Sequence, residues 1–129
     1  MLRNFFLLKL ALGFAIVLAG LNYIAGIFYF YWTLGWYDYM MHYLGGVSVA
    51  LLVAWFISHK SLSWGNALIT IFLVTMFMGG AWEVFEYVNG ITFATEGYTL
   101  DTVHDLLMDA LGALTVGYLY IRNRNGNRN

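Results

Sequence analysis

The sequence of 129 residues contains no cysteine and no proline, and only 10% of its residues are charged. Without cysteine there can be no disulfide, thiolate ligand or cysteine nucleophile, so any metal site must use histidine and carboxylates. Without proline, no helix-breaking residue interrupts the long apolar segments. Soluble domains average about 25% charged residues, whereas 61% of this chain is hydrophobic. The composition is typical of a membrane protein, and the lack of a basic stripe with interleaved aromatics argues against nucleic-acid binding.

Four apolar runs account for most of the chain. They cover residues 10–34, 39–57, 66–87 and 102–121. Each is close to the ~20 residues that a helix needs to cross a hydrocarbon core of about 30 Å, and each is too long and too continuously apolar for a barrel strand. The sequence therefore predicts an all-α fold. We expect one integral membrane domain over residues 1–129, built as an up-down-up-down bundle of four transmembrane helices in the lipid bilayer.

The start of the chain also has features of a secretory signal. A basic n-region precedes an apolar segment, and Val17-Leu18-Ala19 is acceptable to signal peptidase. Against cleavage after Ala19, apolarity continues unbroken past Tyr31. That length favours a full span over a cleaved leader.

The basic residues lie only in alternate connections. Arg3 and Lys9 precede or open the first run, and Lys60 lies between the second and third. Arg122, Arg124 and Arg128 follow the fourth run, and the two other connections hold no Lys or Arg. Because positive charge stays on the cytoplasmic side during insertion, this pattern predicts a multi-pass protein of the plasma (inner) membrane with both termini in the cytoplasm.

Two of the expected helices share a local pattern. Residues 38–46 and 105–113 both read Asp-x-x-Met-(His or Asp)-x-Leu-Gly-small. Both segments would run from outside to inside, so the match suits two parallel helical hairpins related by an axis along the membrane normal. Short apolar alignments also arise by chance, so a repeat and a coincidence both remain open.

The acidic residues gather at the expected outer ends of three helices. Helical residues three or four apart share a face, which pairs Asp38 with His42 and Glu83 with Glu86 and aligns residues 101, 105 and 109. At 1.5 Å of rise per residue, these groups lie within roughly 10 Å of the outer boundary. Carboxylates from three helices and at least one imidazole should therefore meet at one depth.

This cluster predicts a metal centre. Ionisable groups inside a span cost ~2.5 to 3.5 kcal/mol each on insertion scales and normally find partners, but no Lys or Arg falls at this depth. Shared protons, a histidine cation or a bound divalent ion must offset the repulsion. Carboxylates with imidazole suit zinc, manganese, iron or magnesium, and the sequence does not choose among them. The candidate metal ligands are Asp38, His42, Glu83, Glu86, Asp105 and Asp109, of which His42, Glu83 and Asp109 are also the candidate catalytic residues.

Some of these residues have simpler interpretations. Asp38 and Asp101 fit the first turn of a helix, where the macrodipole favours acids, and Glu86 could reach the headgroups. His104 lies off the line through residues 101, 105 and 109. The small residues beside the acids would let the helices approach closely; they are Gly45, Gly46, Gly79, Gly80 and Gly112.

A resemblance adds to this interpretation. Three motifs carry the resemblance: Trp36-Tyr37-Asp38 with His42 and Gly46, then Glu83-x-x-Glu86, then Asp101-Thr102-x-x-Asp105 running to Gly112-Ala113-Leu114. This set resembles the uncharacterised bacterial inner-membrane proteins of the YjdF type, although only four helices are evident here, fewer than full-length members have. It is more distantly similar to VanZ-like proteins, in which Gln and Asn commonly replace the counterparts of Glu86 and Asp109. The resemblance implies a polytopic membrane protein and which residues matter, but no activity or substrate.

Three functions fit the sequence. The first is a membrane enzyme at the outer leaflet, a metal-dependent hydrolase or transferase that acts on a lipid-linked or envelope substrate. The second is a transporter or sensor component that binds a cation or protons, although residues 50–57 and 69–76 carry no charge and offer no evident exit. The third is a structural assembly subunit whose polar cluster only fixes helix packing. Oligomeric state is not indicated.

The charge pattern generates a topology prediction. In this cysteine-free background, a single cysteine at Ser61 should be protected from a membrane-impermeant thiol reagent added to intact cells, and one at Thr95 should react. Labelling at Ser61 from outside, or protection at Thr95, would contradict the predicted orientation.

Overall fold

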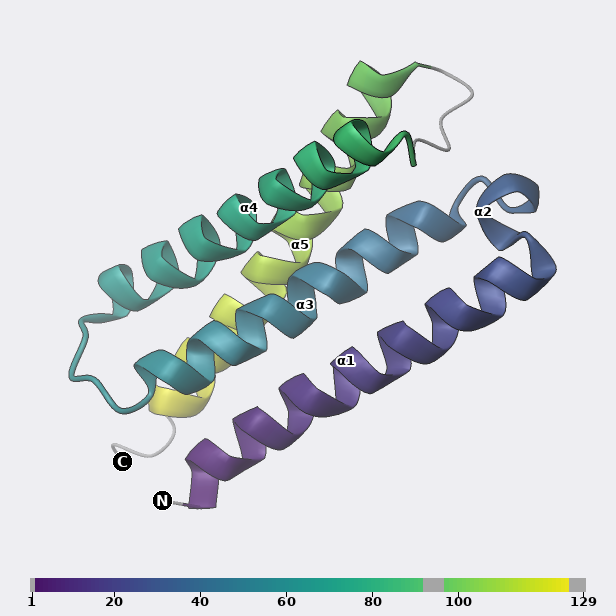
Figure 1. The fold of residues 1–129 in the computed structure, drawn as a ribbon. Coiled ribbons are helices and arrows are strands. Elements are labelled where there is room, and N and C mark those ends of the chain that lie inside the picture. The colour runs from purple at the N-terminus through teal and green to yellow at the C-terminus, as the bar shows by residue number, and fades with distance from the viewer. Residues whose placement is uncertain (1, 92–96, 126–129) are drawn as a thin grey trace.

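The computed structural model describes residues 2–91 and 97–125, and this part of the chain is helical with no strand. It forms α1 (Leu2–Phe28), α2 (Phe30–Thr33), α3 (Tyr37–Ile57), α4 (Trp64–Asn89) and α5 (Tyr98–Asn125) (Figure 1). The all-α prediction is confirmed. The predicted count of four helices is not, because five are present. Three of the described helices are long and apolar enough to cross a membrane, over Phe5–Phe28, Tyr37–Ile57 and Trp64–Asn89.

The first apolar run does not form the single helix predicted over 10–34. The α1 helix ends at Phe28, Tyr29 adopts a left-handed backbone with φ of 58°, and α2 adds one further turn. Aromatic packing explains the break, because Phe30 and Tyr31 place their rings 5.4 and 5.2 Å from the ring of Tyr37. The Tyr37 hydroxyl also donates to the carbonyl of Leu21 in α1. No glycine or proline lies between Phe28 and Leu34, so tertiary contacts rather than a helix-breaking residue account for the break.

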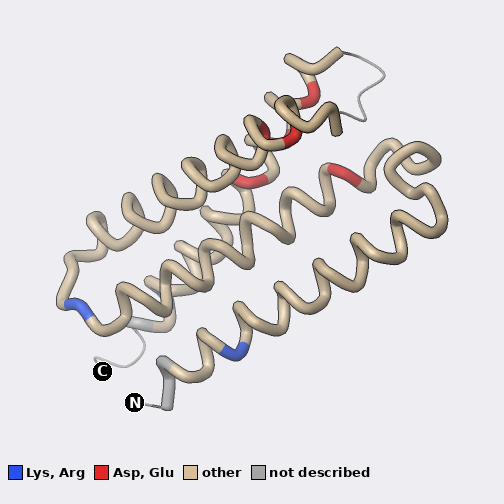
Figure 2. Tube along the Cα trace, in the orientation of Figure 1, with Lys and Arg blue, Asp and Glu red and all other residues tan. Residues whose placement is uncertain are grey.

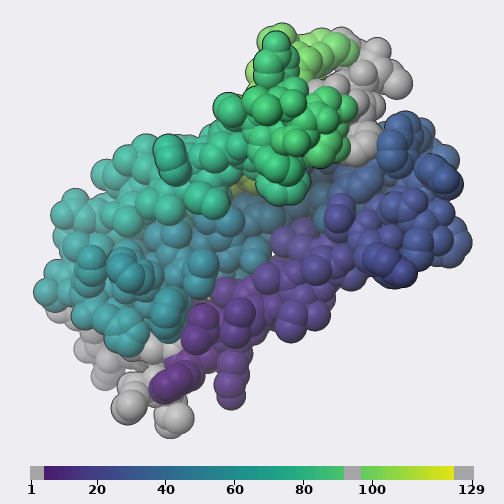
Figure 3. All heavy atoms as spheres, in the orientation of Figure 1, coloured from purple at the N-terminus to yellow at the C-terminus, as the bar shows by residue number. Residues whose placement is uncertain are grey.

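The long helices alternate in direction, so that the chain begins and ends at the same end of the bundle (Figure 1). At the centre, α3 packs against α1, α4 and α5, and α4 also packs against α5. Among the long helices, α1 packs only on α3, and Figure 3 shows it along one side of the molecule. The three mutually packed helices α3, α4 and α5 are those that carry the predicted acidic residues.

Glycines set the distance between α3 and α5. A Cβ on Gly46 would lie 2.7 Å from the backbone oxygen of Asp109, and one on Gly112 would lie 2.7 Å from the carbonyl oxygen of Tyr43. On α4, a Cβ on Gly79 would collide with the Asp109 carboxylate. These three glycines therefore fulfil the predicted role in close helix approach.

The other two glycines do not share that role. A Cβ on Gly45 or Gly80 would meet nothing within 4 Å. The crossing of α3 with α5 presents Gly46 to the partner backbone and turns Gly45 away from it. For Gly45 and Gly80, the prediction of close packing was wrong.

The bundle divides into an apolar half and a polar half. The buried cluster of the apolar half is made of small and aliphatic residues: Ala11, Val47, Ala50, Leu51, Ala54, Ile57, Ala67, Ile71 and Val116. Figure 2 shows the described Lys and Arg near the chain termini and the Asp and Glu at the opposite end. Large apolar side chains cover the outside, including Ile16, Phe77 and Val88, each more than 70% exposed. Such a surface suits contact with lipid rather than water.

Gly45 and Gly46 provide a matched test of the helix crossing. Gly46→Ala should lower the free energy of unfolding by about 1 to 3 kcal/mol, because the new methyl group forces α3 away from α5. Gly45→Ala should be neutral or stabilising, since it enters open space and alanine favours the helix. Thermal unfolding of the purified variants in detergent measures both. Equal effects would show that the crossing does not depend on Gly46.

Candidate metal centre

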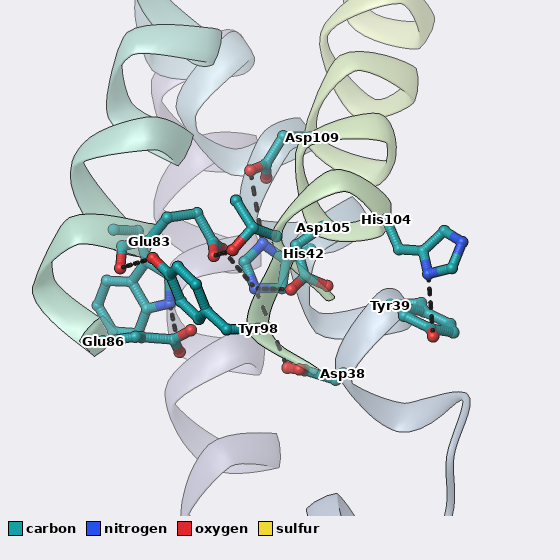
Figure 4. Close-up of polar contacts among 11 residues, drawn as sticks. Asp38, Tyr39, His42, Glu83, Glu86, Tyr98, His104, Asp105 and Asp109 are labelled. Atoms are coloured by element: carbon teal, nitrogen blue, oxygen red, sulfur yellow. Dashed lines mark hydrogen bonds and ion pairs between the residues drawn. The ribbon is translucent and has the colours of Figure 1, made fainter. Parts of the chain in front are cut away.

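The candidate site lies where α3, α4 and α5 meet at the polar end. The first two turns of α3 supply Asp38 and His42, and the last two turns of α4 supply Glu83 and Glu86. Asp105 and Asp109 come from the first half of α5 and complete the group. Figure 4 shows these side chains turned toward a common centre. All six predicted metal ligands are therefore brought together, while their function stays a prediction.

His42 is the hub of the cluster. Its Nε2 lies 3.7 Å from Glu83 Oε1, 3.9 Å from Asp105 Oδ2 and 4.0 Å from Asp38 Oδ1. Its Nδ1 faces the other way and lies 3.4 Å from Asp109 Oδ2. An imidazole carries at most two N–H groups, so His42 cannot bond all four carboxylates at once.

Burial makes the shortage of hydrogen-bond donors for these carboxylates costly. Asp105 is 0% exposed, and the exposed fraction of Glu83, Asp109, His42 and Glu86 is at most 7%. Both carboxylate oxygens of Asp105 and the Oε1 of Glu83 accept no hydrogen bond from any described residue. A buried acceptor left unsatisfied costs about 1 to 3 kcal/mol, and more when it is charged. The cluster therefore needs a ligand or protons that the described side chains do not supply.

Two further side chains hold the glutamates; the sequence assigned a role to neither, although Thr102 belongs to the motif set of the resemblance. The Thr102 hydroxyl donates to Glu83 Oε2 at 2.8 Å, and the Trp82 indole donates to Glu86 Oε1 at 2.8 Å. The available signal was spacing. Thr102 lies three residues before Asp105 on the same face of α5, and Trp82 lies one turn before Glu86.

Two groups near the acids stand apart from the cluster. His104 points away from it and places Nδ1 3.4 Å from the Tyr39 hydroxyl (Figure 4). Asp101 lies in the first turn of α5 and is partly exposed, and Asp38 likewise lies in the first turn of α3. The macrodipole interpretation therefore fits both aspartates, and Asp38 also faces His42.

No described lysine or arginine lies beside the carboxylates. Lys9 lies in the first half of α1, Lys60 between α3 and α4, and Arg122 near the end of α5. Figure 2 shows the visible Lys and Arg at the end opposite the Asp and Glu. Long-range attraction from that end is weak compared with repulsion among carboxylates that surround one ring. The compensating positive charge must therefore be local.

The ligand atoms are close enough to share an ion. One atom each from Asp38, His42 and Asp105 lie within 4.8 Å of one another, as do one atom each from His42, Glu83 and Glu86. A carboxylate set with a single imidazole suits manganese, magnesium, iron or zinc. The buried group can thus hold a metal ion, and its donors do not identify which.

His42 and His104 provide a matched test of whether His42 organises the acidic cluster. His42→Ala should lower the free energy of unfolding by about 3 kcal/mol or more, because breaking a buried charged network leaves uncompensated charge. His104→Ala removes a half-buried, long hydrogen bond and an edge-on ring contact with Tyr39, and should cost about 1 kcal/mol. Thermal unfolding in detergent at neutral pH compares them. Equal losses would mean that His42 does not organise the acids.

Comparison with known proteins places the chain in a family. Residues 1–126 match the family described as "Predicted membrane protein (DUF2238)". An uncharacterized protein of Thermotoga maritima is 26% identical over 103 residues, which cover 75% of this chain and 54% of that relative. The chain thus spans about half the length of this relative. No solved structure matches the chain.

The family match and the relative test the two resemblances drawn from the sequence motifs to different degrees. They establish a membrane-protein family without testing the likeness to YjdF-type proteins, and they give no support to the likeness to VanZ-like proteins. The description of the matched family names no activity. The chain belongs to the DUF2238 family of predicted membrane proteins.

Proposed function

We propose that this membrane protein binds a divalent metal ion between α3, α4 and α5 and uses it to hydrolyse or transfer groups of a lipid-linked or envelope substrate. The main support for this proposal is Asp105. This side chain is fully buried, and its two carboxylate oxygens accept no hydrogen bond from the described residues. A helix rarely buries such a group without a partner. A cation coordinated by Asp105 and its neighbours supplies that partner.

The two faces of His42 divide the cluster into roles. A metal-binding histidine usually donates its second N–H to a carboxylate, which fixes the tautomer and the ring orientation. Here Asp109 lies beside Nδ1, whereas Glu83, Asp105 and Asp38 face Nε2. We therefore assign Nε2 and these three carboxylates to the ion. Asp109 acts on the ion through His42.

The remaining acid is placed for proton transfer. A divalent ion lowers the pKa of bound water and so generates a nucleophile near neutral pH. Glu86 has an oxygen within 4.8 Å of ligand atoms of His42 and Glu83, and Trp82 holds its Oε1. In our proposal Glu86 accepts a proton from the attacking group, and Glu83 remains with the metal.

The alternatives are transport and assembly. For a transporter or sensor of cations or protons, the acidic end provides a binding site, but the other half of the bundle is lined by Ala50, Ala54, Ile71 and Val116. That apolar packing argues against a polar pathway through the bundle. An assembly role would use the cluster only to fix helix packing, and metal binding distinguishes it from the other two.

The placement in the membrane is part of the proposal. The α5 helix counts as the fourth span, giving one up-down-up-down membrane domain with its polar end at the outer leaflet and both termini in the cytoplasm. The restriction of basic residues to alternate connections supports this orientation. The motif resemblance to YjdF-type inner-membrane proteins agrees with a plasma-membrane location.

Metal binding is the decisive test. Purified protein should carry about one divalent ion per chain, and a chelator should lower its apparent unfolding temperature by several degrees, since a ligand at 100 times its Kd stabilises by about 2.7 kcal/mol. Added manganese, zinc or magnesium should restore it. Elemental analysis and thermal unfolding in detergent measure both effects. Asp105→Asn should remove both the bound metal and the response.

The two aspartates at the edge of the cluster provide an internal control. Asp109→Asn should weaken metal binding more than Asp38→Asn. The buried Asp109 orients the His42 ring toward the ion, whereas water can take the place of the partly exposed Asp38 as a ligand. A protein with no bound metal and no response to any added ion would instead favour proton sharing. The metal-dependent enzyme would then be the wrong function.

A further inference from the structure

We propose that Thr102 determines metal specificity by restricting Glu83 to one coordinating oxygen, which favours small divalent cations over calcium. This inference rests on the proposed metal site and adds a residue outside its ligand set. The observation behind it is the unequal environment of the two Glu83 oxygens. Oε2 accepts the Thr102 hydroxyl at 2.8 Å, whereas Oε1 is buried, lies 3.7 Å from His42 Nε2 and accepts no hydrogen bond from the described residues.

The start of α5 fixes this arrangement from two directions. Tyr98 and Thr102 are one turn apart on α5 and both contact Glu83. The Tyr98 hydroxyl donates to the backbone carbonyl of Glu83 at 3.2 Å, and the Thr102 hydroxyl donates to its carboxylate. One contact holds the helix and the other holds the side chain, so Glu83 cannot easily rotate to present both oxygens to an ion.

The number of oxygen atoms that the ligands present to an ion distinguishes large cations from small ones. Calcium takes six to eight oxygen ligands at about 2.3 to 2.6 Å and readily accepts a carboxylate through both oxygens. Magnesium requires near-octahedral geometry at about 2.0 to 2.1 Å, and zinc is satisfied by four ligands. For Glu83 to bind calcium through both oxygens, its carboxylate must rotate so that Oε2 also faces the ion, which strains the charge-assisted hydrogen bond from Thr102. The Thr102 hydroxyl therefore penalises calcium selectively.

Other polar groups outside the cluster support no comparable proposal. The Thr75 hydroxyl is buried without a described partner, but no ligand-like group faces it in the described contacts. The pair of Tyr39 and His104 is half-exposed and already hydrogen-bonded. Thr102 differs because its hydroxyl bonds one carboxylate oxygen of Glu83, Oε2, and leaves the other oxygen, Oε1, without a hydrogen bond from the described residues.

The test compares manganese and calcium binding in full-length protein purified in detergent. Thr102→Val removes the hydroxyl and keeps the shape, so the ratio of the calcium Kd to the manganese Kd should fall about tenfold, the approximate worth of one hydrogen bond to a charged group. Thr102→Ala removes the same hydroxyl with less volume and should give the same change. Thr102→Ser keeps a donor and should preserve the wild-type ratio.

Two further variants separate specificity from stability. Tyr98→Phe should lower thermal stability without changing the ratio, because it frees the Glu83 carbonyl but not Oε2. Thr70→Val is the matched control on α4, since the Thr70 hydroxyl bonds only its own helix, at the carbonyl of Asn66. It should leave the ratio unchanged.

The outcomes distinguish this inference from the proposed function. If the wild-type protein binds manganese and the Thr102→Val and Thr102→Ala variants keep its ratio, the specificity role is wrong and the metal site stands. If the wild-type protein binds neither ion, the metal site itself fails, and the role of Thr102 fails with it. A fall in the ratio shared by Thr70→Val would also overturn the inference.

Discussion

The contact of one imidazole with carboxylates from three helices is the constraint on which the polar half of this bundle depends. Asp38 and His42 share α3, but Glu83 and the α5 aspartates arrive only if α4 and α5 pack closely on it. Gly46 and Gly112 permit that approach, and Gly79 leaves room for the Asp109 side chain. A helix displacement of one methyl group would separate atoms that now lie within 4 Å of the ring. The glycines are thus part of the site although they contribute no ligand atom.

The sequence predicted which acidic and histidine side chains meet better than it predicted the side chains that support them. Helical spacing alone placed Glu83 beside Glu86 and Asp105 beside Asp109, because a 3.6-residue period is independent of the neighbouring helix. Depth followed from counting residues inward from the expected boundary. Spacing places Thr102 on the face of Asp105 but does not reveal its role, because a helical threonine usually bonds its own backbone and only the docked α4 gives its hydroxyl another acceptor. Gly45 and Gly46 were likewise indistinguishable, since the rotation of α3 at the crossing decides which one faces α5.

The break after α1 has a similar origin. Nothing between Phe28 and Leu34 is a poor residue for a membrane helix, so periodicity extended the first span too far. The left-handed Tyr29 carries a backbone cost of about 1 to 3 kcal/mol. It persists because the turn seats Phe30 and Tyr31 against Tyr37 at the start of α3. Aromatic packing there also fixes the first turn of the helix that carries Asp38 and His42.

The distances around His42 leave its carboxylate neighbours without hydrogen bonds to Nε2. This nitrogen lies 3.7 to 4.0 Å from three carboxylate oxygens, which is too long for a hydrogen bond. Atoms bound to one ion at about 2.0 to 2.2 Å lie roughly 3 to 4 Å from one another. The three distances from Nε2 are therefore compatible with donors that share one ion, and the glycines at the contacts of α3, α4 and α5 help to maintain them.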